Sequence, residues 1–78
     1  MTGRTISTHI EVFTTNIERS KDAKHVISLL KSRFPHAFIN IDLEDCERVL
    51  RFENTVIDQA EILNLVQSTG FSISIMEE

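Results

Sequence analysis

The sequence predicts a small α+β domain with six elements in the order strand, helix, strand, strand, helix, strand. Two segments repeat apolar residues at three- and four-residue spacing, which is the helical period. Four shorter segments alternate apolar and polar residues, which is the period of a half-buried strand. With 78 residues, 41% of them hydrophobic and 26% charged, the chain suits one compact domain. We therefore expect a single domain over residues 1–78, with its folded part at about 6–76.

The first strand and the first helix are predicted from these two periods. The strand is expected to place one alternating set in the core and the other in water: Ile10, Val12 and Thr14 inward, and His9, Glu11 and Phe13 outward. The helix is expected from about Lys21 to Phe34, and Ser20 can cap its first turn. Pro35 ends it, because the residue before a proline avoids helical angles. Its core-facing side chains are Ala23, Val26, Ile27, Leu30 and Phe34.

A second and a third strand follow, joined by a short turn at residues 44–47. Their alternation predicts a core-facing set made of Ile39, Ile41, Leu43, Leu50 and Phe52. The opposite set faces outward and consists of Phe38, Asn40, Asp42, Val49, Arg51 and Glu53.

The second helix is expected to open at Asn54-Thr55 and to end at Gly70. Its core-facing residues are Val56 or Ile57, Ala60, Ile62, Leu63 and Val66. In the last strand, the residues Phe71, Ile73 and Ile75 alternate with Ser72, Ser74 and Met76. This order of elements is that of the ferredoxin-like βαββαβ fold, so we expect a four-stranded antiparallel sheet with two helices on one face.

Several positions between Ile10 and Ile75 match one family with this fold. Leu30 falls at an apolar position late in the family's first helix, and Ile41-Asp42-Leu43-Glu44 falls on a Val-Asp-Leu-Glu-like second strand. Gly70-Phe71 fits the turn that precedes its last strand. On these residues the chain resembles the small heavy-metal-associated (HMA) domain of copper chaperones and metal-pumping ATPases. The resemblance implies that the sheet has the strand order fourth, first, third, second.

The metal motif of that family is missing. Its first loop carries Gly-Met-x-Cys-x-x-Cys and binds a soft metal through both thiolates. At the matched register, Ile17 takes the methionine position, and Arg19 and Asp22 take the two cysteine positions. Arg19 and Asp22 can pair with each other instead, at i and i+3. The resemblance therefore implies an HMA-like domain with a degenerate metal loop and no bound cofactor.

A metal site built from other ligands is the alternative hypothesis. Asp22 and His25 stand at i and i+3 on the first helix and so share a face. In this fold the first loop and the turn that contains Cys46 lie at the same end of the domain. A trio of Asp22, His25 and Cys46 suits weak zinc binding better than copper(I). The alternative function is accordingly a metal-ion carrier or sensor with noncanonical ligands, although Arg19 places a positive charge where the cation would bind.

Charge and composition exclude other classes. The net charge of −4 disfavours a nucleic-acid role, because phosphate binding requires clustered Lys and Arg, and we expect the eight basic residues to be scattered among the twelve acidic ones. No apolar run approaches the ~20 residues of a membrane span, so we expect no membrane insertion. The single cysteine, Cys46, excludes an internal disulfide, and without a signal-peptide-like start a cytoplasmic location is expected. Cys46 lies in a turn between Asp45 and Glu47, which does not resemble a nucleophile with its base and orienting group, so no enzyme activity is predicted.

The same order of elements also occurs in amino-acid-sensing domains, RNA-recognition motifs and acylphosphatases, so a site must decide the function. RNA recognition needs exposed aromatic and basic residues on the central strands, and the third strand offers mainly Val49 and Glu53 beside Arg51. An acylphosphatase-like anion cradle at Arg19 would lack a glycine. The predicted interaction face, on the uncovered side of the sheet, is formed by Phe13, Phe38, Val49 and Met76. We therefore predict a small protein-interaction or regulatory module, which binds an unknown protein partner or a second copy of the chain.

Overall fold

The computed structural model describes residues 8–76, so residues 6 and 7 of the predicted folded part lie outside the described residues. The elements follow in the predicted order: β1 His9–Thr15, α1 Ser20–Arg33, β2 Phe38–Asp42, β3 Val49–Asn54, α2 Gln59–Gln67 and β4 Ile73–Ile75. Neither of the two helices in this part of the chain has the length and apolar character that crossing a membrane requires.

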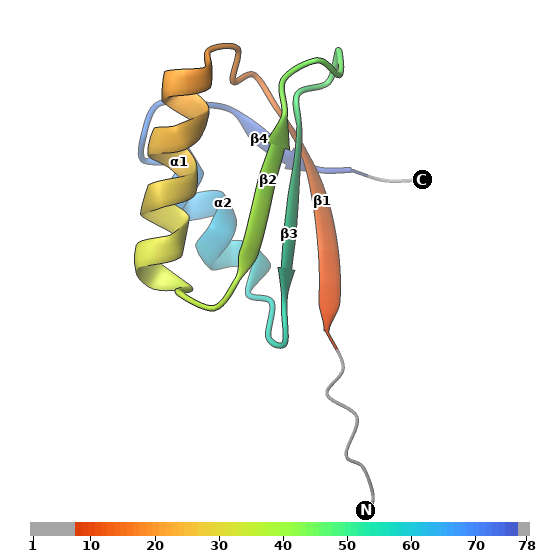
Figure 1. The fold of residues 1–78 in the computed structure, drawn as a ribbon, viewed down its shortest axis with the longest axis vertical. Coiled ribbons are helices and arrows are strands. Elements are labelled where there is room, and N and C mark those ends of the chain that lie inside the picture. Colours follow the sequence, from red (N-terminus) through yellow and green to blue (C-terminus); the bar gives the residue numbers. More distant parts are fainter. Residues whose placement is uncertain (1–7, 77–78) are drawn as a thin grey trace, which may run out of the picture.

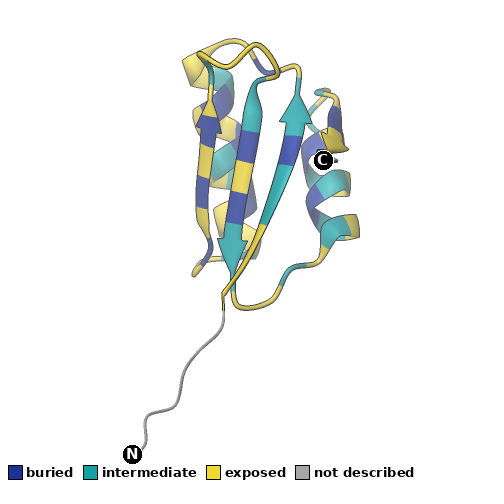
Figure 2. Cartoon of the chain, turned by 90° about the vertical axis from the view of Figure 1, so that its right-hand side faces the viewer, coloured by how far each residue is buried: buried dark blue, intermediate teal, exposed yellow. Residues whose placement is uncertain are grey.

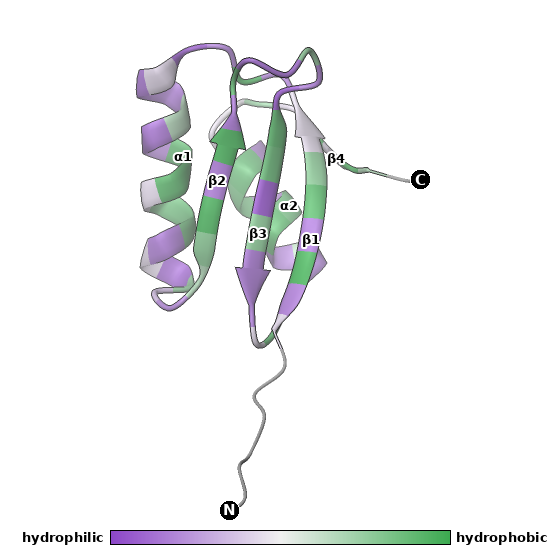
Figure 3. Cartoon of the chain, turned by 45° about the vertical axis from the view of Figure 1, so that its right-hand side comes forward, coloured by the Kyte–Doolittle hydropathy of each residue, from purple (hydrophilic) through white to green (hydrophobic). Residues whose placement is uncertain are grey.

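The four strands form one antiparallel sheet in the order β2-β3-β1-β4, as predicted (Figure 1). Both helices lie on the same side of this sheet, with α1 against β2 and α2 against β4. The ferredoxin-like α+β class is thereby confirmed. One side of the sheet is covered by helices, and no element within residues 8–76 covers the other side (Figures 1 and 3).

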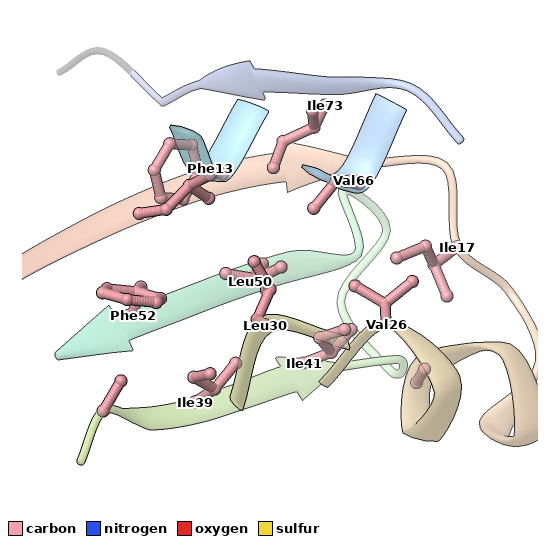
Figure 4. Packing of buried hydrophobic residues seen from close by; sticks show 13 residues of the cluster. Phe13, Ile17, Val26, Leu30, Ile39, Ile41, Leu50, Phe52, Val66 and Ile73 are labelled. Atoms are coloured by element: carbon pink, nitrogen blue, oxygen red, sulfur yellow. The ribbon is translucent and has the colours of Figure 1, made fainter. Parts of the chain in front are cut away.

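The hydrophobic core lies between the helices and the sheet (Figure 4). Its buried residues are Phe13, Ile17, Ala23, Val26, Leu30, Ala37, Ile39, Ile41, Leu50, Phe52, Ile62, Val66 and Ile73. The rings of Phe34 and Phe52 meet edge to face, with centroids 5.3 Å apart and planes at 87°. This geometry is one that aromatic pairs prefer, and it attaches the end of α1 to the middle of the sheet. The predicted inward faces of α1, β2 and β3 are confirmed.

The predicted inward face of β1 is wrong. Phe13 is 0% exposed, whereas Ile10 is 54% exposed and Val12 is only partly buried (Figure 2). The physical reason is the register, because Phe13 is paired with Leu50 on β3 and paired residues project from the same side of a sheet. Since Leu50 faces the helices, Phe13 faces them too. Ile10 and Val12 are therefore on the uncovered side.

The helix starts also differ from the prediction. Ser20 is the first residue of α1 rather than its cap, and Arg19 at the cap position makes no side-chain capping bond. The second helix begins at Gln59, because Asp58 is its cap and accepts a hydrogen bond from the Glu61 N–H at 3.2 Å. The prediction placed Val56 or Ile57 on the inward face, and Ile57 does pack against the core, whereas Val56 is 70% exposed. Ala60 lies inside α2 but is exposed, so its predicted inward position is wrong. Gly70, at φ +97°, follows α2 in the left-handed conformation expected of a helix stop.

Candidate functional site

Three connections meet at one end of the domain, as predicted. The Thr15 N–H donates to the Glu47 carbonyl at 3.1 Å, and the Thr15 hydroxyl donates to the Arg48 carbonyl at 2.7 Å. These bonds attach the end of β1 to the β2–β3 turn. Asn16 then joins the α2–β4 connection, where its Oδ1 accepts from the Ser72 N–H at 2.8 Å and its own N–H donates to the Ser72 carbonyl at 3.3 Å. The first loop, between β1 and α1, is thus held on two sides by protein groups.

The loop is also anchored from within by Ile17. This side chain is 0% exposed and belongs to the core, and its N–H donates to the Thr15 hydroxyl at 3.2 Å. Arg19 follows in an extended conformation and is exposed, whereas Asp22 is half-buried on the first turn of α1. Among residues 8–76 these two side chains form no ion pair, so the predicted pairing is wrong. The i, i+3 rule applies within a helix, and Arg19 lies just outside it.

The alternative zinc trio is not assembled. His25 is exposed on α1, and Cys46 is exposed in the β2–β3 turn with a free thiol. Within the described part of the chain, no three His, Cys, Asp or Glu side chains are grouped closely enough to hold a metal ion. Asp22, His25 and Cys46 therefore share one end of the domain without converging on a point.

The uncovered side of the sheet, which we call the open face, is the second candidate region. Its three rows of neighbouring residues, read from β2 toward β4, are Phe38, Glu53 and Ile10; Asn40, Arg51, Val12 and Met76; and Asp42, Val49, Thr14 and Ser74. Of the four predicted face residues, Phe38, Val49 and Met76 are in these rows. Phe13 is not, because it is in the core. Ile10 and Val12 take its place, and the pairing of β1 with β3 is the signal that identifies them.

One basic residue, Arg51, lies among apolar and acidic residues on the open face. A shallow hollow of about 370 Å³ is lined by Val12, Asn40, Asp42, Asp45, Val49, Arg51 and Met76. Arg51 is exposed at the middle of the face, and its cross-strand neighbours are Val12 and Asn40. We would expect Arg51 to pair across the strands with Glu11 or Asp42, but within residues 8–76 no carboxylate lies within ion-pair distance of its guanidinium. Glu11 is paired with Phe52 and so projects from the helix side.

The two carboxylates nearest the hollow have structural partners. One oxygen of Asp42 accepts a hydrogen bond from the Glu44 N–H at 3.1 Å, and one oxygen of Asp45 accepts from the Glu47 N–H at 2.8 Å. Both bonds hold the β2–β3 turn in place, as short side chains often do in turns. The guanidinium of Arg51 therefore remains available to a carboxylate from outside the domain.

Known proteins do not decide between these regions. The chain matches no model of a known protein family, and it matches no curated protein. The fold is therefore established by the elements and their order, whereas the HMA-like identity stays a prediction from the quoted residues.

Proposed function

We propose that this chain is a non-enzymatic HMA-like domain with a degenerate metal loop, and that it acts as a protein-interaction or regulatory module in the cytoplasm. The loop supports the first part of this proposal. In place of two thiolates it has Arg19 and Asp22, and its shape is maintained by buried Ile17 and by the bonds between Asn16 and Ser72. These contacts order the loop through the protein's own groups, so a metal ion has no structural task there.

The open face carries the proposal of an interaction role. Phe38 is 70% exposed and Ile10 is 54% exposed, and both are at the same end of this face. Val12, Val49 and Met76 extend the apolar surface around Arg51. A single exposed apolar residue is ordinary, but apolar side chains that join across adjacent strands mark interaction surfaces. An arginine framed by apolar groups is also a frequent energetic centre of an interface.

The position of Arg51 favours a different protein as the partner over a second copy. A two-fold contact between identical chains places the same patch against itself. Centred on the open face, such a contact would bring two copies of Arg51 together, and the nearby carboxylates of Asp42 and Asp45 already accept hydrogen bonds within the β2–β3 turn. A different protein can instead present a carboxylate to Arg51 and apolar side chains to Val12 and Val49. We therefore propose a partner protein whose surface combines these two features.

Site-specific photo-crosslinking tests this proposal. A benzophenone amino acid replaces Val49 on the open face or, as the control, exposed Ala60 on α2. We expect a cross-linked protein from position 49 that is absent from position 60, and we then measure the affinity of that protein in pure form. Arg51→Glu should weaken binding at least about tenfold, because the partner's carboxylate then meets a like charge. The matched variant Arg33→Glu should bind as the wild type does.

Two results would overturn the proposal. The first is the same cross-linked product from both positions, and the second is an unchanged affinity for Arg51→Glu. Circular dichroism of each variant checks that the fold is intact. We expect an intact fold, because Arg51 and Arg33 are both exposed and neither belongs to the core.

A further inference from the structure

The outer edge of β2 has unpaired backbone groups. In the order β2-β3-β1-β4, β2 hydrogen-bonds to β3 on one side only. Its five residues, Phe38–Asp42, alternate regularly between exposed and buried, contain no proline, and include one charged residue, Asp42, at the end of the strand. Proteins usually protect such an edge with charged residues, proline or a bulge within the strand. The β2 edge therefore provides a template to which another extended segment can pair.

A row of lysines borders this edge. Lys21, Lys24 and Lys31 are exposed on α1 and lie within about a quarter of its circumference. We call them the lysine flank. The Nζ of Lys31 donates to the Ala37 carbonyl at 3.2 Å, directly before β2, which places this side of α1 at the β2 edge (Figures 1 and 3). Within residues 8–76 no lysine of the flank has an ion-pair partner.

On the opposite side of α1 the basic residue has an ion-pair partner. There Arg33 is paired with Glu61 of α2 at 2.6 Å, so its charge is already matched inside the domain. Although the whole chain carries a net charge of −4, five of its eight Lys and Arg residues lie within residues 19–33. The expected scatter of basic residues is therefore wrong, because basic charge is concentrated in α1 and at its cap position. Its unmatched part includes Lys31, which lies at the start of β2.

We infer that the β2 edge binds an extended segment of another protein in which acidic and apolar residues alternate. Successive side chains of an added strand project to opposite sides of the sheet. On the helix side they would meet the lysine flank, which favours carboxylates. On the open side they would lie beside Phe38, which is 70% exposed and favours apolar groups. This inference rests on the proposed interaction role. It shares Phe38 with the open face, but it uses the β2 edge and the lysine flank instead of Arg51.

The spacing of the lysines fits this kind of segment. Lys24 and Lys31 are seven residues apart, or about 10 Å along the helix axis. Carboxylates two residues apart on a strand are separated by about 7 Å. The lysine side chains are long and flexible enough to make up the difference between these two spacings of about 10 Å and about 7 Å. A second copy of this chain fits less well, because pairing β2 with its own copy would bring two lysine flanks together.

A synthetic peptide provides the direct probe. The probe is a seven-residue peptide of alternating glutamate and valine, with blocked ends and a fluorescent label, and its affinity is measured by fluorescence anisotropy. Amide chemical shifts should change at Phe38–Asp42 and along the lysine flank. A peptide of the same composition with its valines in one block should bind at least about tenfold more weakly, because it cannot present one residue type to each side. Equal affinity of the two peptides would overturn the inference.

Backbone methylation separates strand pairing from simple charge attraction. An antiparallel strand hydrogen-bonds to its neighbour through alternate residues. N-methyl groups on one alternate set of peptide nitrogens should therefore abolish binding, whereas methyl groups on the other set should be tolerated. If both methylated peptides bind as the parent does, no strand is added, and the lysines only protect the edge.

Protein variants complete the test. Lys24→Gln should weaken peptide binding about two- to fivefold, as expected for one exposed ion pair. The matched variant Arg33→Gln removes the same charge from the other side of α1 and should have no effect. Equal losses in the two variants would overturn the inference, as would amide protection of β2 that rises with protein concentration alone. Arg51→Glu should leave peptide binding unchanged, so failure of the edge site and failure of the open-face site are distinguishable.

Discussion

Replacement of Phe13 by alanine should be among the most damaging substitutions in β1. The side chain is 0% exposed and lies between the sheet and the helices, where its neighbours on the paired strands are Leu50 and Ile75. Truncating a fully buried phenylalanine costs about 3–5 kcal/mol, because the transfer free energy is lost and a cavity remains. A chain of 78 residues has a total unfolding free energy of about 4–12 kcal/mol. Phe13→Ala should therefore remove a large fraction of the stability.

Urea unfolding followed by far-ultraviolet circular dichroism measures this loss. Phe13→Leu serves as a milder variant that keeps more of the protein folded, with an expected cost of about 1 kcal/mol. The matched control is Ile10→Ala, which should cost about 1 kcal/mol or less because the side chain is already 54% exposed. A larger loss for Ile10→Ala than for Phe13→Ala would refute the assignment of Phe13 to the helix side.

Four further predictions concern α1, α2, the first loop and the alternative zinc ligands. Leu30→Ala should cost about 2–5 kcal/mol in the same urea assay, since Leu30 is fully buried, and a cost below about 1 kcal/mol would contradict the inward face of α1. Asp58→Ala should cost about 1 kcal/mol through loss of the cap of α2, whereas Asp58→Asn should retain most of the stability. In competition with a strong copper(I) chelator, the protein should take up no copper, because no thiolate pair is present in the first loop; stoichiometric transfer would contradict the degenerate-loop proposal. Any weak zinc affinity of the wild type should be unchanged in His25→Ala and in Cys46→Ser, since these side chains do not converge.

Periodicity was sufficient for most of the fold, because it is strong where only one face of an element is apolar. In β3, Leu50 and Phe52 alternate with charged neighbours, and in α1 the positions of Val26 and Leu30 allow one inward face. In β1 both alternating sets contain large apolar residues, so the sequence of that strand alone does not choose between them. The choice depends on pairing with Leu50, which is a long-range contact.

The second helix shows a related limit. Its start was predicted at Asn54-Thr55, which lies before the observed cap. The cap decides the start, because Asp58 satisfies the N–H of Glu61, and the residues before it then remain outside the helix. For the candidate sites, the absence of the metal motif could be read directly from the sequence, because it depends only on the identity of Arg19 and Asp22. The unmatched charges of the lysine flank became apparent only when α1 was placed beside β2.

The paired bonds between Asn16 and Ser72 also bear on the order of folding. They connect residues 56 positions apart, so the first loop cannot take its final shape until nearly the whole chain is available. Contacts of such long sequence separation form slowly, because the closure entropy of the intervening chain must be overcome first. During synthesis from the N-terminus, the first loop is thus made early and fixed late. Its ordering would report that β4 has docked, and a protease acting before that step would find the loop still accessible.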